Sequence, residues 1–496
     1  MDDAWPPTGI SAADWAATPP AVQALVRSAL VALQIVQERH TLLEDQLTQL
    51  HQRVRDLEAR LNQHSQNSSK PPSSDPPSAP PRPASVQRGR KAGAQPNHPR
   101  HERPVPDPEQ IDQHCEHYPA ICPTCHDPLS HIQRDACAVQ TQYVWELPIV
   151  RPEVTAHHYH TVCCSGCGSL VTAARPPDVP PGAFGPRVAA AVTLLHGDYH
   201  LSDRTVPRLL ADFFGLPLSL GSVVTLQQVG SAALEKVYDT IHTVVQQQER
   251  CNIDETSWKE NGKRRWLWTM VTAVATFFAV TSSRDGPGLR HLLGTSYSGI
   301  VGSDRHRPYL ALPAERHQLC WSHLIRNFQA LVDRGGREAI WGASFLEVSR
   351  LVFRLWHLFR EGTIDREVLQ DALAPIQATM HELLVQGARR CDAPEGMCQE
   401  LLAHEAALWT FVRVAGVEPT NNAAEQALRG AVLWRKRCFG AHSAEGNRFV
   451  ERILTVSATC RKQQRHLLTF VTEAIEAYWA GRPAPILLAP PTPTPQ

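Results

Sequence analysis

The 496-residue sequence predicts a multidomain α+β protein, and three observations lead to that fold class. Apolar residues follow a heptad pattern through residues 22–61. Two C-x-x-C pairs flank strand-like segments between residues 122 and 167. From residue 250 onward, runs rich in β-branched and aromatic residues alternate with helical patterns. A chain of this length can bury several cores, so we expect separate units joined by linkers.

The composition argues against a globally basic protein and against a membrane span. The 49 Lys and Arg residues balance the 49 Asp and Glu residues, so contacts with nucleic acid must rely on local clusters. No uninterrupted run of about 18 apolar residues occurs. The amino terminus, MDDAWPPTG, lacks the basic start and apolar core of a signal peptide. We therefore expect a cytoplasmic protein with no membrane partner, in which the thirteen cysteines favour metal binding over disulfides.

Residues 20–64 are predicted to form a coiled coil. Apolar residues recur at alternating spacings of three and four, a seam that a single packed helix would lose as its period drifted toward 3.6. His40 is the polar position of this seam and can set its register. The pattern predicts a homodimer. The seam positions are Val22, Val26, Ala29, Leu33, Val36, His40, Leu43, Leu47, Leu50, Val54, Leu57 and Leu61.

Two segments are expected to be disordered. Residues 65–109 are rich in Pro, Ser and Asn and end in a basic stretch, and residues 481–496 are rich in Pro and Thr. Such compositions cannot bury a core.

Residues 110–175 are predicted to bind zinc. Cys122 and Cys125 form one knuckle, Cys164 and Cys167 form a second, and four thiolates in this pattern suit tetrahedral Zn²⁺ in a zinc ribbon. The segments QTQYVWELP and EVTAHHYHTV between the knuckles are expected to be strands. Other potential ligands remain open. They are Cys163 in place of Cys164, and His114, Cys115, His117 and His160.

Residues 180–245 are predicted to be helical. The part from Ser202 to Gly230 fits a helix-turn-helix whose second helix, Ser219 to Gln228, would enter the major groove of DNA. That helix carries few Arg or Lys residues, so a plain helical connector remains an alternative.

Three carboxylates in different settings suggest a metal-dependent site. Asp254 lies in a predicted strand that opens a three-stranded meander, and Asp304 ends a short strand reached by a helical crossover. Parallel strands joined in this way are usually neighbours, so the two Asp side chains are expected side by side. Glu425 arrives from a distant helix. Convergent carboxylates suit Mg²⁺ or Mn²⁺. Glu255 remains a rival to Asp254, because adjacent strand residues face opposite sides.

Polar and basic residues near this site are candidates for substrate binding. Asn422, Glu425 and Arg429 share one helix face, where Asn422 either orients a carboxylate or phosphate or caps the helix. Two short basic clusters, WKENGKRR and WRKRCFG, suit phosphate contacts, although such runs are often only solvated. The candidates from these clusters are Lys263, Arg264, Arg265, Arg435, Lys436 and Arg437.

Residues from about 337 to 412 are predicted to be an all-helical insertion between the second and third carboxylates. Trp341, Trp356 and Trp409 within or beside it are expected mainly in its core, with contact to DNA as the alternative. The pair Cys320 and His323 supplies too few ligands for a zinc site, so a packing or orienting role is expected.

These motifs together resemble transposases of the insertion sequence 66 family. The resemblance rests on NIDET, GIVGSDRHRPY, QLCWSHLIRNF, TNNAAEQALR and WRKRCFGAHSAEGNRF, and it extends to NSSKPPSSDPP and the paired C-x-x-C motifs. It implies an RNase H-like nuclease domain over residues 246–475 with Asp254, Asp304 and Glu425 as a DDE triad. Thr420 stands where the family usually has an acidic residue, and Thr is expected to preserve the helix cap.

The resemblance also implies a function. We expect a bacterial, nucleoid-associated enzyme that cuts the DNA ends of a mobile element and joins them to target DNA, assisted by small proteins encoded in the same element. The alternatives are a structure-selective nuclease of the same fold, and a catalytically silent DNA-binding protein with zinc and coiled-coil modules.

Overall fold

A five-stranded mixed sheet lies at the centre of the C-terminal two thirds of the chain. The computed structural model describes residues 6–7, 9–64, 66–68, 105–129, 140–390 and 393–488. The strand order is β5-β4-β3-β6-β7. The strands are β3 (Arg250–Glu260), β4 (Lys263–Val271), β5 (Thr276–Thr281), β6 (Ile300–Ser303) and β7 (His317–Leu319).

The connections of this sheet follow from its sequence. Strands β3 and β4 form a hairpin around Asn261 and Gly262, which both have positive φ, as a two-residue Asn-Gly turn requires. Strand β5 completes the predicted antiparallel meander. The helix α6 (Gly286–Leu293) then carries the chain to β6, which pairs in parallel with β3. The predicted crossover is therefore present, and it places β3 beside β6.

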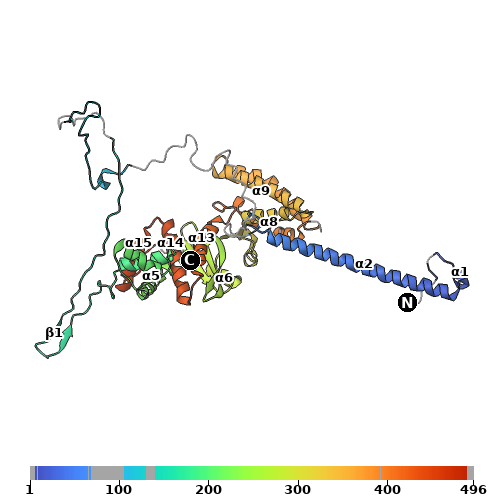
Figure 1. Ribbon diagram of the computed structural model, residues 1–496, viewed down its shortest axis with the longest axis horizontal. Coiled ribbons are helices and arrows are strands. Elements are labelled where there is room, and N and C mark those ends of the chain that lie inside the picture. Colours follow the sequence, from blue (N-terminus) through green and yellow to red (C-terminus); the bar gives the residue numbers. More distant parts are fainter. Residues whose placement is uncertain are drawn as a thin grey trace, which may run out of the picture.

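Helices that precede the strands in the sequence and helices that follow them share one core with the sheet. These are α3 (Pro186–Gly197), α4 (Thr205–Phe214), α5 (Leu220–Val245), α13 (Asn422–Cys438), α14 (Ala444–Lys462) and α15 (Leu467–Trp479). One continuous apolar cluster contains residues from all six helices and from β3, β4, β5 and β6, and Figure 1 shows α5, α14 and α15 gathered beside the sheet. The helices of residues 186–245, expected as a separate region, therefore pack as part of the same globular unit.

Helix α14 covers the edge strand β5 with polar side chains. The Thr455 and Thr459 hydroxyls accept hydrogen bonds from the Phe278 and Thr276 amides at 2.9 and 3.2 Å, and the Glu451 carboxylate accepts from the Val280 amide at 2.6 Å. An exposed edge would offer these amides to another chain. Their pairing closes this side of the sheet.

A second core is mainly helical and includes Leu319 of β7. It contains α8 (Trp321–Arg334), α9 (Glu338–Arg360), α10 (Arg366–Gly387), α11 (Glu395–Ala403) and α12 (Thr410–Arg413). Trp356 and Trp409 are buried in this core, and Trp341 packs against it. The expected helical insertion is thus built around its tryptophans. Short helical turns complete the region at α7 (Arg307–Leu310), η4 (Ala314–Arg316) and η5 (Glu405–Leu408).

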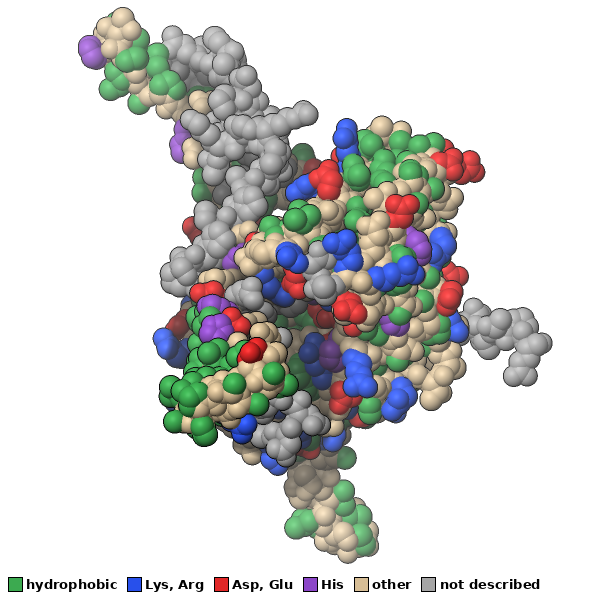
Figure 2. All heavy atoms as spheres, turned by 90° about the vertical axis from the view of Figure 1, so that its right-hand side faces the viewer, with side chains coloured by type: hydrophobic (Ala, Val, Ile, Leu, Met, Phe, Trp, Pro, Cys, Tyr) green, Lys and Arg blue, Asp and Glu red, His purple; other side chains and the backbone are tan. Residues whose placement is uncertain are grey.

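The N-terminal segment is a short helix, α1 (Ala12–Ala17), followed by the 42-residue helix α2 (Pro20–Leu61), which projects from the globular part in Figure 1. After α2, Asn67 donates a hydrogen bond to Asp333 of α8 at 2.9 Å. The apolar seam positions, among them Leu43 (62% exposed) and Leu50 (59%), face solvent. Figure 2, viewed from this side, shows hydrophobic side chains exposed at the near end of the molecule, with acidic and basic side chains interspersed elsewhere.

Helix α2 is also apolar enough to pass a length and composition test for a membrane span. The stretch Pro20–His51 meets it, and none of that stretch is buried within the chain. The same test is met by helices with other roles, so no membrane location follows.

The described residues 105–129 and 140–185 extend away from the globular part and are largely exposed. It contains the turn η2 (Pro108–Gln110) and the two short strands β1 (Thr161–Cys163) and β2 (Leu170–Thr172), which pair around the second cysteine pair. The strand expected at QTQYVWELP is not formed, and EVTAHHYHTV forms a strand only at its end. Short ribbons need a partner surface for stability, and these residues have none in the described chain.

The two segments expected to be disordered fall mainly outside the described residues. Most of 65–109 and all of 489–496 lie there. Within the tail, Leu488 is buried and Leu487 packs against the main core, so residues up to 488 belong to the folded unit.

Candidate nuclease active site

Asp254 and Asp304 lie on the neighbouring strands β3 and β6. Asp304 follows the end of β6 as expected, but Asp254 lies inside β3, because this strand continues to Glu260 in its hairpin with β4. Asn252 is paired with Gly302 in parallel register, so continuing both chains by two residues places the two Asp residues opposite each other. An Asp254 carboxylate oxygen accepts from the Glu255 amide at 2.9 Å, and an Asp304 oxygen accepts from the His306 amide at 2.8 Å. Backbone hydrogen bonds therefore orient both carboxylates.

Asn421 fixes the start of α13, which carries Glu425 in its first turn. The Asn421 side-chain amide donates to the Ile253 carbonyl at 2.8 Å, and its oxygen accepts from the Asn252 amide group at 2.9 Å. Its backbone amide donates to the Cys320 sulfur at 3.1 Å. One fully buried residue thus joins α13 to β3 and to the start of α8.

The three carboxylates act on one another electrostatically. The pKa of Asp254 is raised well above its ordinary value, first by burial and then by the negative charges of Glu255 and Asp304, with a further contribution from Glu425. Carboxylate oxygens are the donors that a hard divalent cation prefers, so the chemistry of these residues suits Mg²⁺ or Mn²⁺. Among the described residues, the oxygens of all three do not lie within 4.8 Å of one another.

Glu255, the alternative to Asp254 as a metal ligand, is paired with other side chains. Its carboxylate is buried, pairs with Arg284 at 2.7 Å and accepts a short hydrogen bond from the Tyr309 hydroxyl. Burial and Asp304 raise the pKa of Glu255, whereas Tyr309 and Arg284 lower it. Because Glu255 is already paired and Asp254 responds to both Asp304 and Glu425, the geometry favours Asp254 as the ligand.

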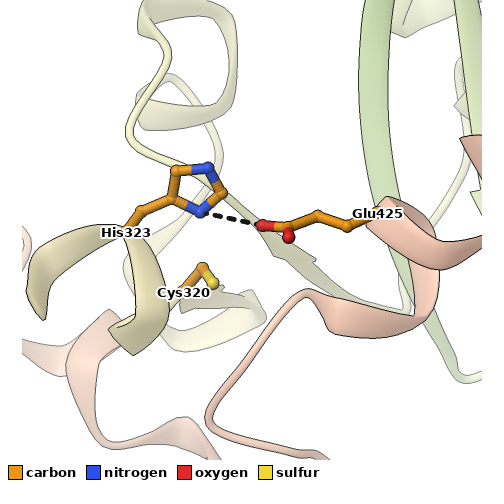
Figure 3. Close-up of side chains that lie close together, drawn as sticks. All are labelled: Cys320, His323 and Glu425. Atoms are coloured by element: carbon orange, nitrogen blue, oxygen red, sulfur yellow. Dashed lines mark ion pairs between the residues drawn. The ribbon is translucent and has the colours of Figure 1, made fainter. Parts of the chain in front are cut away.

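Glu425 meets the first turns of α8, where Arg326 donates to its carboxylate at 3.2 Å. A His323 ring nitrogen lies 3.5 Å from the same carboxylate (Figure 3). The Cys320 sulfur joins this group, and among the described residues it is the one set of three potential metal ligands within 4.8 Å of one another. Burial raises the pKa of the Cys320 thiol to about 11. The sequence predicted too few ligands here, but Glu425 adds a third to the Cys320 and His323 pair, so the group is a candidate metal site. A bound cation would deprotonate the thiol.

Donor groups without protein acceptors surround the carboxylates. Within the described residues, the buried nitrogens Arg305 Nε, His306 Nδ1, His323 Nδ1 and Arg326 Nε have no hydrogen-bond partner. Arg305 is otherwise held by Glu400 at 2.8 Å. Unpaired buried donors are costly unless a ligand or water engages them, and an anionic substrate would supply acceptors.

The comparisons with known proteins agree with this site. A family model described as the transposase IS66 family matches residues 181–448, which contain all three carboxylates. The chain belongs to the IS66 family of transposases. A second model, a family of unknown function (DUF6444), matches residues 17–104.

Two relatives from Sinorhizobium fredii (strain NBRC 101917 / NGR234) are similar to this IS66 family member. The uncharacterized protein y4hP is 25% identical over 398 residues, which cover 72% of this chain and 70% of that protein. The uncharacterized protein y4qI is 24% identical over 285 residues, 51% of this chain and 52% of that protein. The resemblance predicted from the sequence motifs is therefore confirmed at the level of the family, and a DDE family implies a divalent metal.

The predicted substrate-binding residues of this IS66 family member fall into two groups. Arg435 is tied to β3 by hydrogen bonds to Thr256 and Ser257, and Arg265 pairs with Glu260 at 3.2 Å, so both stabilise the fold. The others are exposed to solvent. They are Asn422, Arg429, Lys263, Arg264, Lys436 and Arg437.

Sequence reasoning chose Asn422 and missed Asn421. Asn422 lies exposed in the first turn of α13, whereas Asn421 precedes the helix and makes the buried contacts. The helix begins without a side-chain cap from either Asn421 or the expected Thr420. Paired asparagines look equivalent in a sequence, and only the packing of Ile253 and Cys320 distinguishes them.

The four predicted zinc ligands come together as two separate pairs. Hydrogen bonds from Cys125 lower the pKa of Cys122, and the Ser169 hydroxyl lowers that of Cys167, 3.2 Å away. In the parts of the chain that the structure describes, the two pairs do not form one ligand cluster. The cysteines of each pair therefore lie close together without the other pair.

Proposed function

We propose that this protein is a DNA transposase that cuts the ends of an insertion sequence and joins them to target DNA. The observation that carries the proposal is the electrostatic influence of Asp304 and Glu425 on the buried Asp254, within the region that matches the transposase family. The family match gives no support to the two alternatives, a structure-selective nuclease and a silent DNA-binding protein.

The chemistry is phosphodiester hydrolysis followed by transesterification. A bound Mg²⁺ or Mn²⁺ ion supplies an activated oxygen nucleophile and stabilises charge on the phosphate. Asp254 within β3 and Asp304 just after β6 offer carboxylate oxygens on neighbouring strands, and Glu425 adds a third from α13. Arg326 and His323 orient Glu425 and provide donors for a phosphate oxygen. Water acts in the first step and the freed 3′ hydroxyl of the element acts in the second.

Three further features belong to this proposal. Cys122, Cys125, Cys164 and Cys167 bind one Zn²⁺ when the two knuckles meet. Helix α2 forms a homodimeric coiled coil that holds two DNA ends, because its exposed seam needs an apolar partner. Small accessory proteins encoded in the same element assist the reaction.

The triad is tested by isosteric substitutions. Asp254→Asn, Asp304→Asn and Glu425→Gln each remove a ligand charge without changing size, so each should lower the rate of metal-dependent strand cleavage at least about 100-fold while the protein still folds and binds DNA. Cleavage is measured on labelled element ends with Mg²⁺ and with Mn²⁺.

Glu418→Gln is the matched control, since Glu418 is an exposed glutamate paired with Arg360 outside the site. It should cleave like the unmodified protein. Wild-type cleavage by any one triad variant would remove that residue from the ligand set.

A further inference from the structure

Two basic segments that are far apart in the sequence meet beside the groove between α5 and α14. The Ala441 amide donates to the Lys259 carbonyl at 2.9 Å, and the Asn261 amide donates to the Ala441 carbonyl at 2.8 Å. These two backbone hydrogen bonds pair the loop between α13 and α14 with the tip of the β3–β4 hairpin, as an additional strand would be paired. We call the exposed cations of this junction the basic shelf. They are Lys259, Lys263, Arg264, Arg437 and Arg448.

The basic shelf carries a net positive charge. Glu260, at the same junction, is already engaged by Arg265 at 3.2 Å and by the Asn447 side-chain amide at 2.5 Å. Two acidic residues line the adjoining groove, the exposed Glu445 and Asp203, whose side chain is 41% exposed. The five exposed cations of the shelf outnumber these two carboxylates and create a local field for a polyanion, although the whole chain is neutral.

Phe439 lies in the middle of the shelf in an unusual conformation. It has a φ of +60°, which bulky residues rarely adopt, and its side chain is 76% exposed. Its amide donates to the Arg435 carbonyl at 2.8 Å and closes the end of α13. Glycine is the usual residue at such a helix end, so an exposed phenylalanine there indicates a use for the ring.

The loop holds Phe439 in place. Any side chain at Gly440 would come within 2.3 Å of the Lys259 carbonyl, so the next residue must be a glycine packed against β3. The aromatic ring is thus presented on a fixed backbone.

A groove of about 760 Å³ begins at Phe439. It runs between Arg437 and Arg448 on one side and Val224 and Gln228 of α5 on the other. This volume is within the range of small-molecule sites, roughly 300–1,000 Å³, and can accept a displaced nucleotide. The α5 residues belong to the segment that the sequence assigned to DNA recognition.

We propose that Phe439 stacks on an unpaired DNA base where duplex meets single strand, while the basic shelf holds the adjoining phosphates. An aromatic face beside a basic groove binds single-stranded bases without reading their sequence. This inference rests on the proposed function, because it takes the nucleic acid to be the DNA that the nuclease opens.

The experiment measures binding of the full-length protein to a short forked DNA and to the matching paired duplex, by fluorescence anisotropy in Ca²⁺. A third probe carries an abasic site as the first unpaired position of the fork. Phe439→Gly should bind the fork about tenfold more weakly, and the paired duplex within twofold of wild type. Wild type should bind the abasic fork more weakly than the normal fork by a similar factor. Phe439→Gly should bind the two forks with equal affinity.

Three control variants separate stacking from folding and from charge. Phe439→Gly suits the positive φ, so its Tm should be equal to or above that of wild type. Phe439→Trp should keep the preference for the fork. Phe213→Ala removes an exposed phenylalanine on α4 that is not among the groove residues and should have no effect.

Equal loss on forked and paired DNA, or undiminished fork binding by Phe439→Gly, would overturn the inference. The probes need no strand cleavage. The binding result can therefore be interpreted even if the protein shows no nuclease activity. A failure of stacking would likewise not contradict cleavage by the triad.

Discussion

At the scale of single residues, a neutral side chain holds the charged ones in place. Asn421 is fully buried and bonds β3 through both ends of its amide, while its backbone bonds Cys320. Glu425 follows one helical turn later. The position of the third carboxylate therefore depends on hydrogen bonds that carry no charge, and salt should affect them little.

Asn421→Ala should destabilise the protein by about 3 kcal/mol, because the Asn252 amide group and the Ile253 carbonyl lose their partners inside the fold. Urea denaturation measures this difference. The rate of cleavage should also fall, because α13, which carries Glu425, loses the contacts that fix its first turn. Asn422→Ala, at the exposed neighbour, should change stability by no more than about 0.5 kcal/mol. Similar losses in both variants would contradict the role given to Asn421.

Glu451 predicts a pH dependence of stability. Burial raises its pKa to about 7, although the Val280 amide and nearby arginines oppose the shift. A carboxyl whose pKa is raised by folding stabilises the protein fully below its ordinary pKa of 4.5, and this contribution is lost as the pH rises through 7. Glu451→Gln keeps an acceptor for Val280 and should therefore stabilise the protein at pH 8, by at most about 3 kcal/mol.

The comparison with wild type at low pH provides the control for Glu451. At about pH 3 the wild-type carboxyl is protonated in both the folded and the unfolded state, so the two proteins should have nearly equal free energies of unfolding. A pH-independent difference between them would show that the carboxyl does not titrate as described.

Residue identity alone predicted part of this site. The crossover correctly placed Asp254 and Asp304 on neighbouring strands, although Asp254 lies inside β3 and not at its end, and Glu425 came from the family resemblance. The contacts of Asn421, the pairing of Glu255 with Arg284 and Tyr309, and the exposed Phe439 did not follow. Each depends on which side chains from distant segments meet, and neither spacing nor periodicity carries that information.

At the scale of elements, strong local signals gave correct structure and weak ones did not. The Asn-Gly turn, the meander and the crossover to β6 each have a local cause in turn residues or apolar periodicity. The residues between the cysteine pairs have strand-like composition, but the described chain gives them no surface to pack on, and residues 140–160 form no strand. Zinc would provide the missing constraint by joining the knuckles.

The zinc proposal predicts about one Zn²⁺ per chain in the purified full-length protein. Cys122→Ser and Cys164→Ser should each lose the metal, since either substitution removes one of four thiolates. Metal content and protease digestion of residues 110–175 measure the effect, because zinc should order this segment. Cys163→Ser is the control and should retain zinc. Loss of zinc in Cys163→Ser but not in Cys164→Ser would show that Cys163, and not Cys164, is the zinc ligand.

At the scale of the whole molecule, the described chain contains two cores and one projecting helix. The sheet with α3–α5 and α13–α15 forms one core, and α8–α12 form the other. The sequence predicted the helices of residues 186–245 but not their packing against the sheet. Periodicity defines an apolar face, and only the folded chain shows which face it meets. Glu425 lies where the two units join, bonded to Arg326 of the second.

Helix α2 supplies the last prediction, because its apolar seam has no partner within the described chain. Leu43, Leu50 and Leu57 lie one heptad apart, and each is at least half exposed. Replacing all three by Gln should leave the globular unit folded and convert a dimer to a monomer, since successive polar seam positions cost more than the remaining seam can offset. Sedimentation velocity measures the state of association.

The same triple variant should separate two activities of the protein. Cleavage of a single end should continue, whereas joining of paired ends should fall sharply because the second end is no longer held at high effective concentration. The matched control changes Glu38 to Gln and Asp45 to Asn, on the side of α2 away from the seam, and should remain dimeric. A triple variant that stays dimeric would place the interface elsewhere in the molecule. A monomer that still joins paired ends would show that α2 does not bring the ends together.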